Sequence, residues 1–172
     1  MKIRFAVAGS VLFFFGIAVG YASQKLDPSL YHGKSKQDAA RSLLEAARVQ
    51  AGDGSWERIA IGRIQYLGGM KADGQAVFDG ILSTKHAASD EFRIARVYCE
   101  AGEWPKAKPL FDHYVAENPK DKTEIAEIGA YYLINGDRAT AEGLFDKSFA
   151  LSSELWATVA AAGAYLDVAP QE

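Results

Sequence analysis

The chain repeats itself with a period of 34 residues. Seven marked positions between Ala95 and Pro119 recur between Gly129 and Ser153, and five of the seven pairs keep the same residue or exchange one small residue for another. The first set is Ala95, Tyr98, Gly102, Trp104, Ala107, Phe111 and Pro119; the second is Gly129, Tyr132, Gly136, Arg138, Ala141, Phe145 and Ser153. Self-similarity at a fixed period of about 20 to 50 residues is the sequence signature of repeat architectures. Each repeat then buries its apolar face only when neighbours stack on it.

Each copy predicts a hairpin of two helices. Gly102 and Gly136 suit the left-handed residue that ends a helix. The small residues Ala95 and Ala107 allow two helices to approach closely, and Phe111 fills the space one turn later. This pattern and its period resemble the tetratricopeptide repeat (TPR) family, whose members are arrays of helix-turn-helix units. The resemblance covers about residues 35–167 and implies an all-α fold: an α-solenoid of TPR-like helical hairpins.

The resemblance is specific after Ala88 and weaker before it. Residues 55–83 look like a repeat whose register to the next one slips by one residue. Gly74 and Gly80 fall inside its second helix, where each costs about 1 kcal/mol relative to Ala, so this helix is expected to be short and the least stable. Glu91 and Ile125 stand where the family usually has Trp near the repeat start. These departures leave the family's particular ligands unassigned.

An uncharged, apolar run extends from Phe5 to Ala22. Eighteen residues of helix span about 27 Å, close to the hydrocarbon core of a bilayer, and Lys2 and Arg4 favour a cytoplasmic amino terminus. We therefore expect residues 1–22 to be a transmembrane anchor, followed by a linker over 23–34, the repeat domain and a tail over 168–172. We expect a single-pass protein of a bacterial inner membrane, with its repeats in the periplasm. The alternative is a signal peptide that is cleaved near Ala22.

Composition argues against several classes of function. The net charge of -3 does not suit nucleic-acid binding, which is normally basic and clustered. The single cysteine, Cys99, allows no disulfide within the chain. His32, His86 and His113 are far apart in the sequence, no metal-ligand spacing occurs, and no cofactor motif is present. The sequence therefore predicts a protein without enzymatic activity, cofactor or metal, and leaves its oligomeric state open.

The family resemblance also implies a binding surface. In TPR proteins the first helix of each repeat lines a concave groove that holds a peptide segment of a partner. The groove positions carried over to this chain are Trp56, Ile59, Arg63, Tyr66, Phe92, Arg96, Glu100 and Leu133. Arg63 and Arg96, one repeat apart, are expected to grip a carboxylate. Two alternatives remain: Arg96 and Glu100, four residues apart, pair with each other, or the apolar members belong to the core or lie beneath the amino-terminal helix.

These features together predict a scaffold for protein–protein interaction. In the first hypothesis it is anchored in a membrane, and its repeats dock an envelope protein or a subunit of a membrane complex. In the second it is a soluble periplasmic or secreted adaptor that signal-peptide cleavage releases. An enzyme built on a repeat scaffold is the third, and the scattered titratable residues argue against it.

Overall fold

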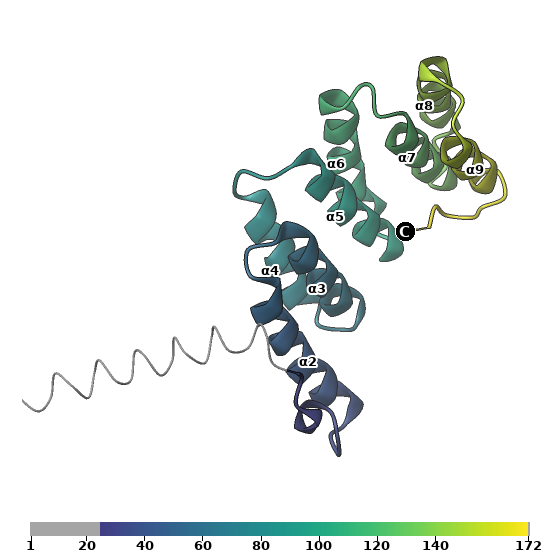
Figure 1. Cartoon of the computed structure of the whole chain (residues 1–172). Helices are drawn as coiled ribbons and strands as arrows, with labels where there is room; N and C mark the ends of the chain where they lie inside the picture. Colours follow the sequence, from purple (N-terminus) through teal and green to yellow (C-terminus); the bar gives the residue numbers. More distant parts are fainter. Residues whose placement is uncertain (1–24, 172) are drawn as a thin grey trace, which may run out of the picture.

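The computed structural model describes residues 25–171, and this part of the chain forms helices and no strand (Figure 1). The predicted all-α class is therefore confirmed for the described residues. The helices in chain order are η1 (Pro28–Leu30), α2 (Lys36–Ala51), α3 (Ser55–Leu67), α4 (Lys71–Leu82), α5 (Ala88–Glu100), α6 (Trp104–Glu117), α7 (Lys122–Ile134), α8 (Arg138–Leu151) and α9 (Leu155–Ala164).

The helices are arranged as a row of hairpins. The pairs α3–α4, α5–α6 and α7–α8 each pack closely along their length, with α2 before the first pair and α9 after the last (Figure 1). Between hairpins, α3 packs against α5 and α7 packs against α9, and an ion pair between Arg96 and Glu127 joins α5 to α7. This is a solenoid-like architecture in which a hairpin contacts mainly its neighbours.

The same turn closes all three hairpins. Its glycine has a positive φ, which is 88° at Gly69, 71° at Gly102 and 90° at Gly136, a region that favours glycine. The next backbone N–H donates to the carbonyl five residues earlier; the bonds run from Met70 to Gln65 (2.8 Å), from Glu103 to Tyr98 (2.8 Å) and from Asp137 to Tyr132 (3.0 Å). Gln65, Tyr98 and Tyr132 are therefore equivalent positions. They are spaced 33 and then 34 residues apart, which confirms the predicted slip of one residue.

Close helix crossings hold each hairpin together. Phe78 and Phe111 are fully buried at the crossings, and Phe145 is nearly so. A Cβ atom added to Gly74 would lie 2.6 Å from the backbone oxygen of Gly62, so α3 and α4 touch through their backbones here. Gly74 therefore serves a contact that no other residue permits. The second helix of this hairpin was predicted to be short because it contains Gly74 and Gly80. α4 indeed has 12 residues, whereas α6 and α8 each have 14.

Side chains at two helix starts bond the backbone in different ways. The Ser35 side chain accepts the Asp38 backbone N–H at 3.1 Å and caps α2, as a serine before a helix favours. Ser89, which the sequence also offers as a cap, does not act as one, because α5 already begins at Ala88. There the Asp90 carboxylate accepts the Ala87 backbone N–H at 3.2 Å, and that bond takes the place of a serine cap.

The expected membrane anchor, Phe5 to Ala22, lies outside the described residues. Over residues 25–171, no helix combines the length and the apolar character that crossing a bilayer requires. The predicted linker contains the short helix η1, and Asp27 caps it by accepting the Ser29 backbone N–H at 2.8 Å.

Candidate partner-binding face

The eight predicted groove residues lie on three first helices. Four are on α3, three on α5 and one on α7; in chain order they are Trp56, Ile59, Arg63, Tyr66, Phe92, Arg96, Glu100 and Leu133. Three of them, Ile59, Tyr66 and Phe92, are buried, with exposed fractions of 4%, 4% and 6%. The expectation of an open groove surface therefore does not hold for these three side chains, because the packing of successive hairpins encloses them. Leu133 is half-buried against the same core.

Tyr66 joins two hairpins. Its hydroxyl donates to Glu103 Oε2 at 2.6 Å, and Lys106 Nζ donates to that hydroxyl at 2.9 Å. Lys71 also donates to the Glu103 carboxylate. These bonds, that of Lys71 foremost, lower the pKa of Glu103 to about 2. The cluster ties α3 and the start of α4 to the start of α6.

Both predicted arginines bind carboxylates of the next first helix. Arg63 Nε lies 3.1 Å and 2.9 Å from the two Glu100 oxygens, and Arg63 Nη2 lies 2.7 Å from Oε2. Arg96 Nε lies 3.2 Å from Glu127 Oε1 on α7. The alternative that Arg96 pairs with Glu100 is therefore wrong, since the partners come from neighbouring hairpins. An incoming carboxylate would have to displace these contacts, and the predicted grip remains a prediction.

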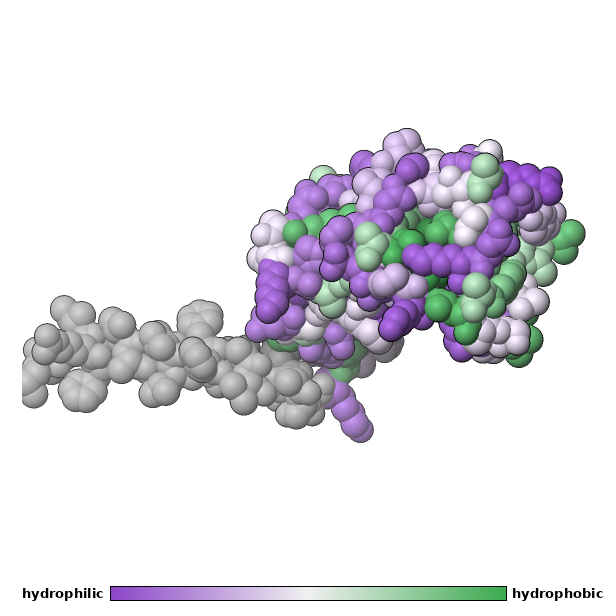
Figure 2. Space-filling view, turned by 90° about the horizontal axis from the view of Figure 1, so that it is seen from above, coloured by the Kyte–Doolittle hydropathy of each residue, from purple (hydrophilic) through white to green (hydrophobic). Residues whose placement is uncertain are grey.

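Exposed aromatic side chains lie at both ends of the series of first helices. Trp56 on α3 is 57% exposed, and the Arg93 guanidinium stacks over its ring at 3.4 Å. Trp156 on α9 is 66% exposed, and Val159, one turn later, is 50% exposed. Large exposed apolar side chains of this kind mark interaction surfaces when they gather. Figure 2 shows hydrophobic residues in a hollow of the upper face and at the end of the molecule opposite the grey residues.

A groove of about 670 Å³ runs beside α9. Thr123 and Glu127 of α7 form one side, and Trp156 and Val159 of α9 form another. Its remaining lining comes from Ala160, Gly163 and the tail residues Val168, Ala169, Pro170 and Gln171. The residues predicted as a tail are thus part of a surface depression next to the last helix.

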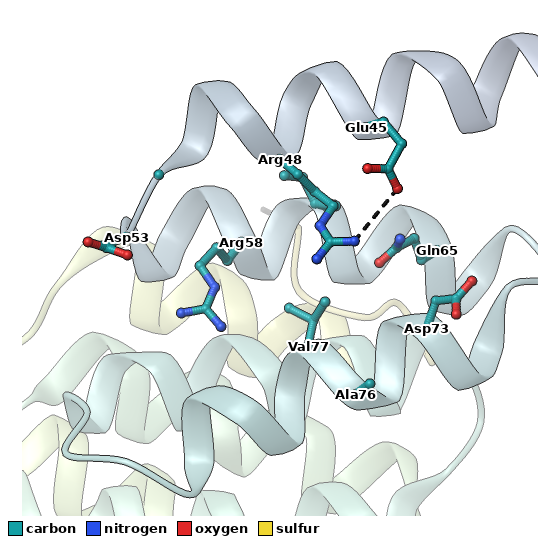
Figure 3. A pocket seen from close by; sticks show the side chains of 10 residues that line it. Glu45, Arg48, Asp53, Arg58, Gln65, Asp73, Ala76 and Val77 are labelled. Atoms are coloured by element: carbon teal, nitrogen blue, oxygen red, sulfur yellow. Dashed lines mark ion pairs between the residues drawn. The ribbon is translucent and has the colours of Figure 1, made fainter. Parts of the chain in front are cut away.

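A second depression, of about 600 Å³, separates α2 from the first hairpin (Figure 3). Glu45 and Arg48 reach into it from α2, and their charged groups are 3.6 Å apart. Arg58 and Gln65 of α3 line it, and Asp73 of α4 closes one side. This cleft was not predicted from the sequence. Its one sequence signal is Gln65, which replaces the tyrosine found at the equivalent position of the later hairpins.

The structure brings together two histidines, His86 and His113, that lie far apart in the sequence. Glu91 of α5 is buried, and its two carboxylate oxygens lie 2.7 Å from His86 Nε2 and 2.6 Å from His113 Nδ1. His86 Nδ1 lies 2.6 Å from the Thr84 carbonyl. Because both ring nitrogens of His86 face oxygens that only accept, the arrangement requires the imidazolium form. The hydrogen bond to Glu91 accordingly raises the pKa of His86.

The signal for this cluster was present in the sequence. Glu91 replaces the large apolar residue that the TPR pattern has at that position, which predicts a buried carboxylate in need of partners. Its partners stand 5 and 22 residues away in the chain, so only the folded hairpin reveals them. Among residues 25–171, no group of three or more His, Cys, Asp or Glu side chains is placed to hold a metal ion.

Cys99 does not have the surroundings of a reactive thiol. It is partly buried on α5, and burial raises its pKa to about 12. A nucleophilic cysteine needs a lowered pKa and a neighbouring cation or base. The surroundings of Cys99 are those of a small packed hydrophobic residue.

Comparison of the chain with protein-family models, with curated proteins and with solved structures gives no match.

Proposed function

We propose that this protein is a TPR-like, non-enzymatic scaffold that binds a segment of a partner protein on the face formed by α3, α5, α7 and α9. The observation that carries the proposal is the exposure of Trp56 and Trp156 at the two ends of that face. Tryptophan and arginine are enriched among residues that dominate binding energy. Burying two such side chains against a partner would remove a large apolar area from water.

The interior of the face supports the same proposal. Arg63–Glu100 and Arg96–Glu127 link α3 to α5 and α5 to α7, so the surface between the two tryptophans is polar and held in place. Protein interfaces commonly combine apolar anchors with a polar surround. The buried residues Ile59, Tyr66 and Phe92 support the surface from beneath, and Trp56 and Trp156 make the contacts.

We further propose that Phe5 to Ala22 anchors the scaffold in a membrane, with the repeats on the periplasmic side and with an envelope protein or membrane-complex subunit as partner. The alternative is a soluble adaptor released by cleavage. Intact-mass analysis of the protein from its own cells separates them. A mass near 18.6 kDa in the membrane fraction supports the anchor, whereas loss of about 22 residues with release into the soluble fraction rejects it.

Site-specific photo-crosslinking tests the binding face. A photoreactive amino acid replaces Trp56 or Trp156 in the full-length protein, and Asp146, an exposed residue of α8, serves as the matched control. We expect one partner, identified by mass spectrometry, to crosslink at both tryptophan positions and not at position 146. Equal labelling at all three positions, or none at either tryptophan, would reject the proposed face.

A further inference from the structure

In the second and third hairpins, a tyrosine closes the junction with the preceding helix. Tyr98 of α5 packs its ring against Phe78 of α4, with 5.8 Å between ring centroids, and its hydroxyl accepts Gln75 Nε2 at 2.8 Å. Tyr132 of α7 packs on Trp104 of α6, with 4.9 Å between centroids, and its hydroxyl donates to Asp112. Both tyrosines are buried, so each phenol fills its junction and makes a hydrogen bond there.

The first junction lacks this ring. Gln65 holds the equivalent position on α3, because its carbonyl accepts the same turn hydrogen bond as those of Tyr98 and Tyr132. The helix before it is α2, which buries only one residue, Ala46. The cleft of about 600 Å³ lies between α2 and this hairpin, where a phenol would otherwise pack (Figure 3). Clefts of about 300–1,000 Å³ are the size of ordinary ligand sites.

The side-chain carbonyl oxygen of Gln65 lacks a hydrogen-bond donor. Gln65 is 6% exposed, and its Oε1 atom makes no hydrogen bond within residues 25–171. A buried carbonyl oxygen without a donor is unfavourable, and each such group in a folded protein calls for an explanation. Because Oε1 is shielded from solvent in this position, a donor that enters the cleft with its ligand would satisfy it once the Gln65 side-chain amide turns toward the cleft.

The cleft also provides apolar walls and two arginines, beside the carboxylates of Glu45, Asp53 and Asp73. Ile61, a buried residue, and Val77 form apolar walls. At the later junctions a lysine lies over each tyrosine ring: Lys106 Nζ is 5.3 Å from the centroid of Tyr98, and Lys108 Nζ is 5.3 Å from that of Tyr132. At the first junction, Arg48 and Arg58 supply the cations. Guanidinium groups stack well on aromatic rings.

We infer that the cleft between α2, α3 and α4 binds a tyrosine side chain from a partner protein, with the phenol hydroxyl donating to Gln65 Oε1. The incoming ring takes the place that Tyr98 and Tyr132 occupy within the chain at the later junctions. The inference rests on the proposed function only in assigning the tyrosine to a protein partner. The cleft is a separate site from the face that carries Trp56 and Trp156.

Binding of N-acetyl-tyrosinamide to the full-length protein in lipid nanodiscs tests this inference. The side-chain amide NMR signal of Gln65 is followed, and N-acetyl-phenylalaninamide is the matched probe without the hydroxyl. We expect millimolar tyrosine probe to shift the Gln65 signal, and the phenylalanine probe to bind about tenfold more weakly, since it lacks one hydrogen bond. No shift, or equal affinities for the two probes, would overturn the assignment.

Three variants sharpen the test. Gln65→Tyr fills the cleft from within and should abolish probe binding, whereas Asp146→Tyr on α8 adds a tyrosine elsewhere and should not. Gln65→Leu keeps the cleft open without the acceptor, so the two probes should then bind equally. If Gln65→Tyr does not fold, comparing the two probes on Gln65→Leu still tests whether Gln65 Oε1 accepts the phenol hydroxyl.

The two proposals fail separately. Crosslinking of a partner at Trp56 and Trp156 without probe binding rejects the tyrosine site in the cleft and leaves the proposed binding face standing. Probe binding without crosslinking at either tryptophan rejects only the proposed binding face.

Discussion

At the scale of single residues, the buried carboxylate of Glu91 organises a polar cluster at the junction between the first two hairpins. It accepts from His86, in the loop between α4 and α5, and from His113 on α6. The neighbouring Asp90 accepts the Ser55 hydroxyl of α3 at 2.9 Å. Four segments of the chain therefore meet at two adjacent acidic residues. Hydrogen bonds to charged groups are stronger than neutral ones, so the protonation of His86 bears on how firmly these segments are held.

The first prediction is a stability that falls as the pH rises. The pKa of His86 is higher in the folded protein than its unfolded value of about 6.5. The contribution of the imidazolium is thus complete below about pH 6.5 and is lost as the pH rises through the folded pKa. The variant His86→Asn should lose of order 1 kcal/mol of unfolding free energy at pH 5.5, and its loss should be smaller at pH 8.5. Urea unfolding at both pH values measures this difference.

The matched control is His32→Asn, because His32 lies in the exposed segment before α2. That variant should follow the wild-type pH dependence. If His86→Asn retains the same pH dependence as the control, the imidazolium assignment is wrong.

The outcome at single residues shows what the sequence can predict. Gly102 and Gly136 predicted their turns because a positive φ is a local requirement. The partners of Arg63 and Arg96 were not predictable, since each pairs with a residue 37 or 31 positions away on another helix. The burial of Ile59 and Phe92 depends in the same way on how the neighbouring hairpin packs. The resemblance placed these residues on the correct helices and left their surroundings undetermined.

At the scale of elements, the hairpins depend on helices that cross at contact distance. The second helix of the first hairpin contains glycine at Gly74, where the equivalent residues Ala107 and Ala141 carry a methyl group. A Cβ atom at Gly74 would lie 2.6 Å from both Gly62 O and Tyr66 N. Glycine lowers the intrinsic stability of α4, but it allows α3 and α4 to pack closer together than any side chain would permit, and this packing offsets the loss.

The second prediction compares two substitutions in helices. Gly74→Ala should destabilise the protein by about 1–3 kcal/mol, because the methyl group forces α3 and α4 apart. Gly143→Ala on α8, where no atom beyond the neighbouring backbone of the helix itself lies within 4 Å of the added Cβ, should stabilise it by about 0.5–1 kcal/mol. Thermal unfolding of both variants measures the two shifts. Shifts of the same sign would contradict the helix-crossing argument.

At the scale of the whole molecule, stability is unevenly distributed. α2 buries only Ala46, whereas α5 and α7 each bury seven residues. In an array of hairpins, each unit draws its stability from itself and its neighbours. α2 packs against the first hairpin, and the cleft beside Gln65 interrupts the contact between them.

The third prediction concerns local opening. Backbone amides of α2 should exchange with solvent faster than those of α5 and α7, because segments with few buried contacts open without global unfolding. Hydrogen–deuterium exchange of the full-length protein, read by mass spectrometry, measures this order. Equal protection in α2 and α5 would show that α2 is held more firmly than its burial indicates. Saturation with N-acetyl-tyrosinamide should slow exchange in α2 if the cleft binds it.

The hairpins are joined differently on their two sides. Aromatic rings connect the second helix of one hairpin to the first helix of the next, as in Trp104–Tyr132 and Phe111–Tyr131. Charged pairs connect successive first helices, and the Arg63–Glu100 pair is a third exposed to water. The Arg96–Glu127 pair is more deeply buried, with side chains 12% and 14% exposed. Parting a buried ion pair costs far more than parting an exposed one, and buried rings lose their packing when they part. Of the two charged links, the one between the first and second hairpins is therefore the easier to loosen, and a bend of the row should begin there.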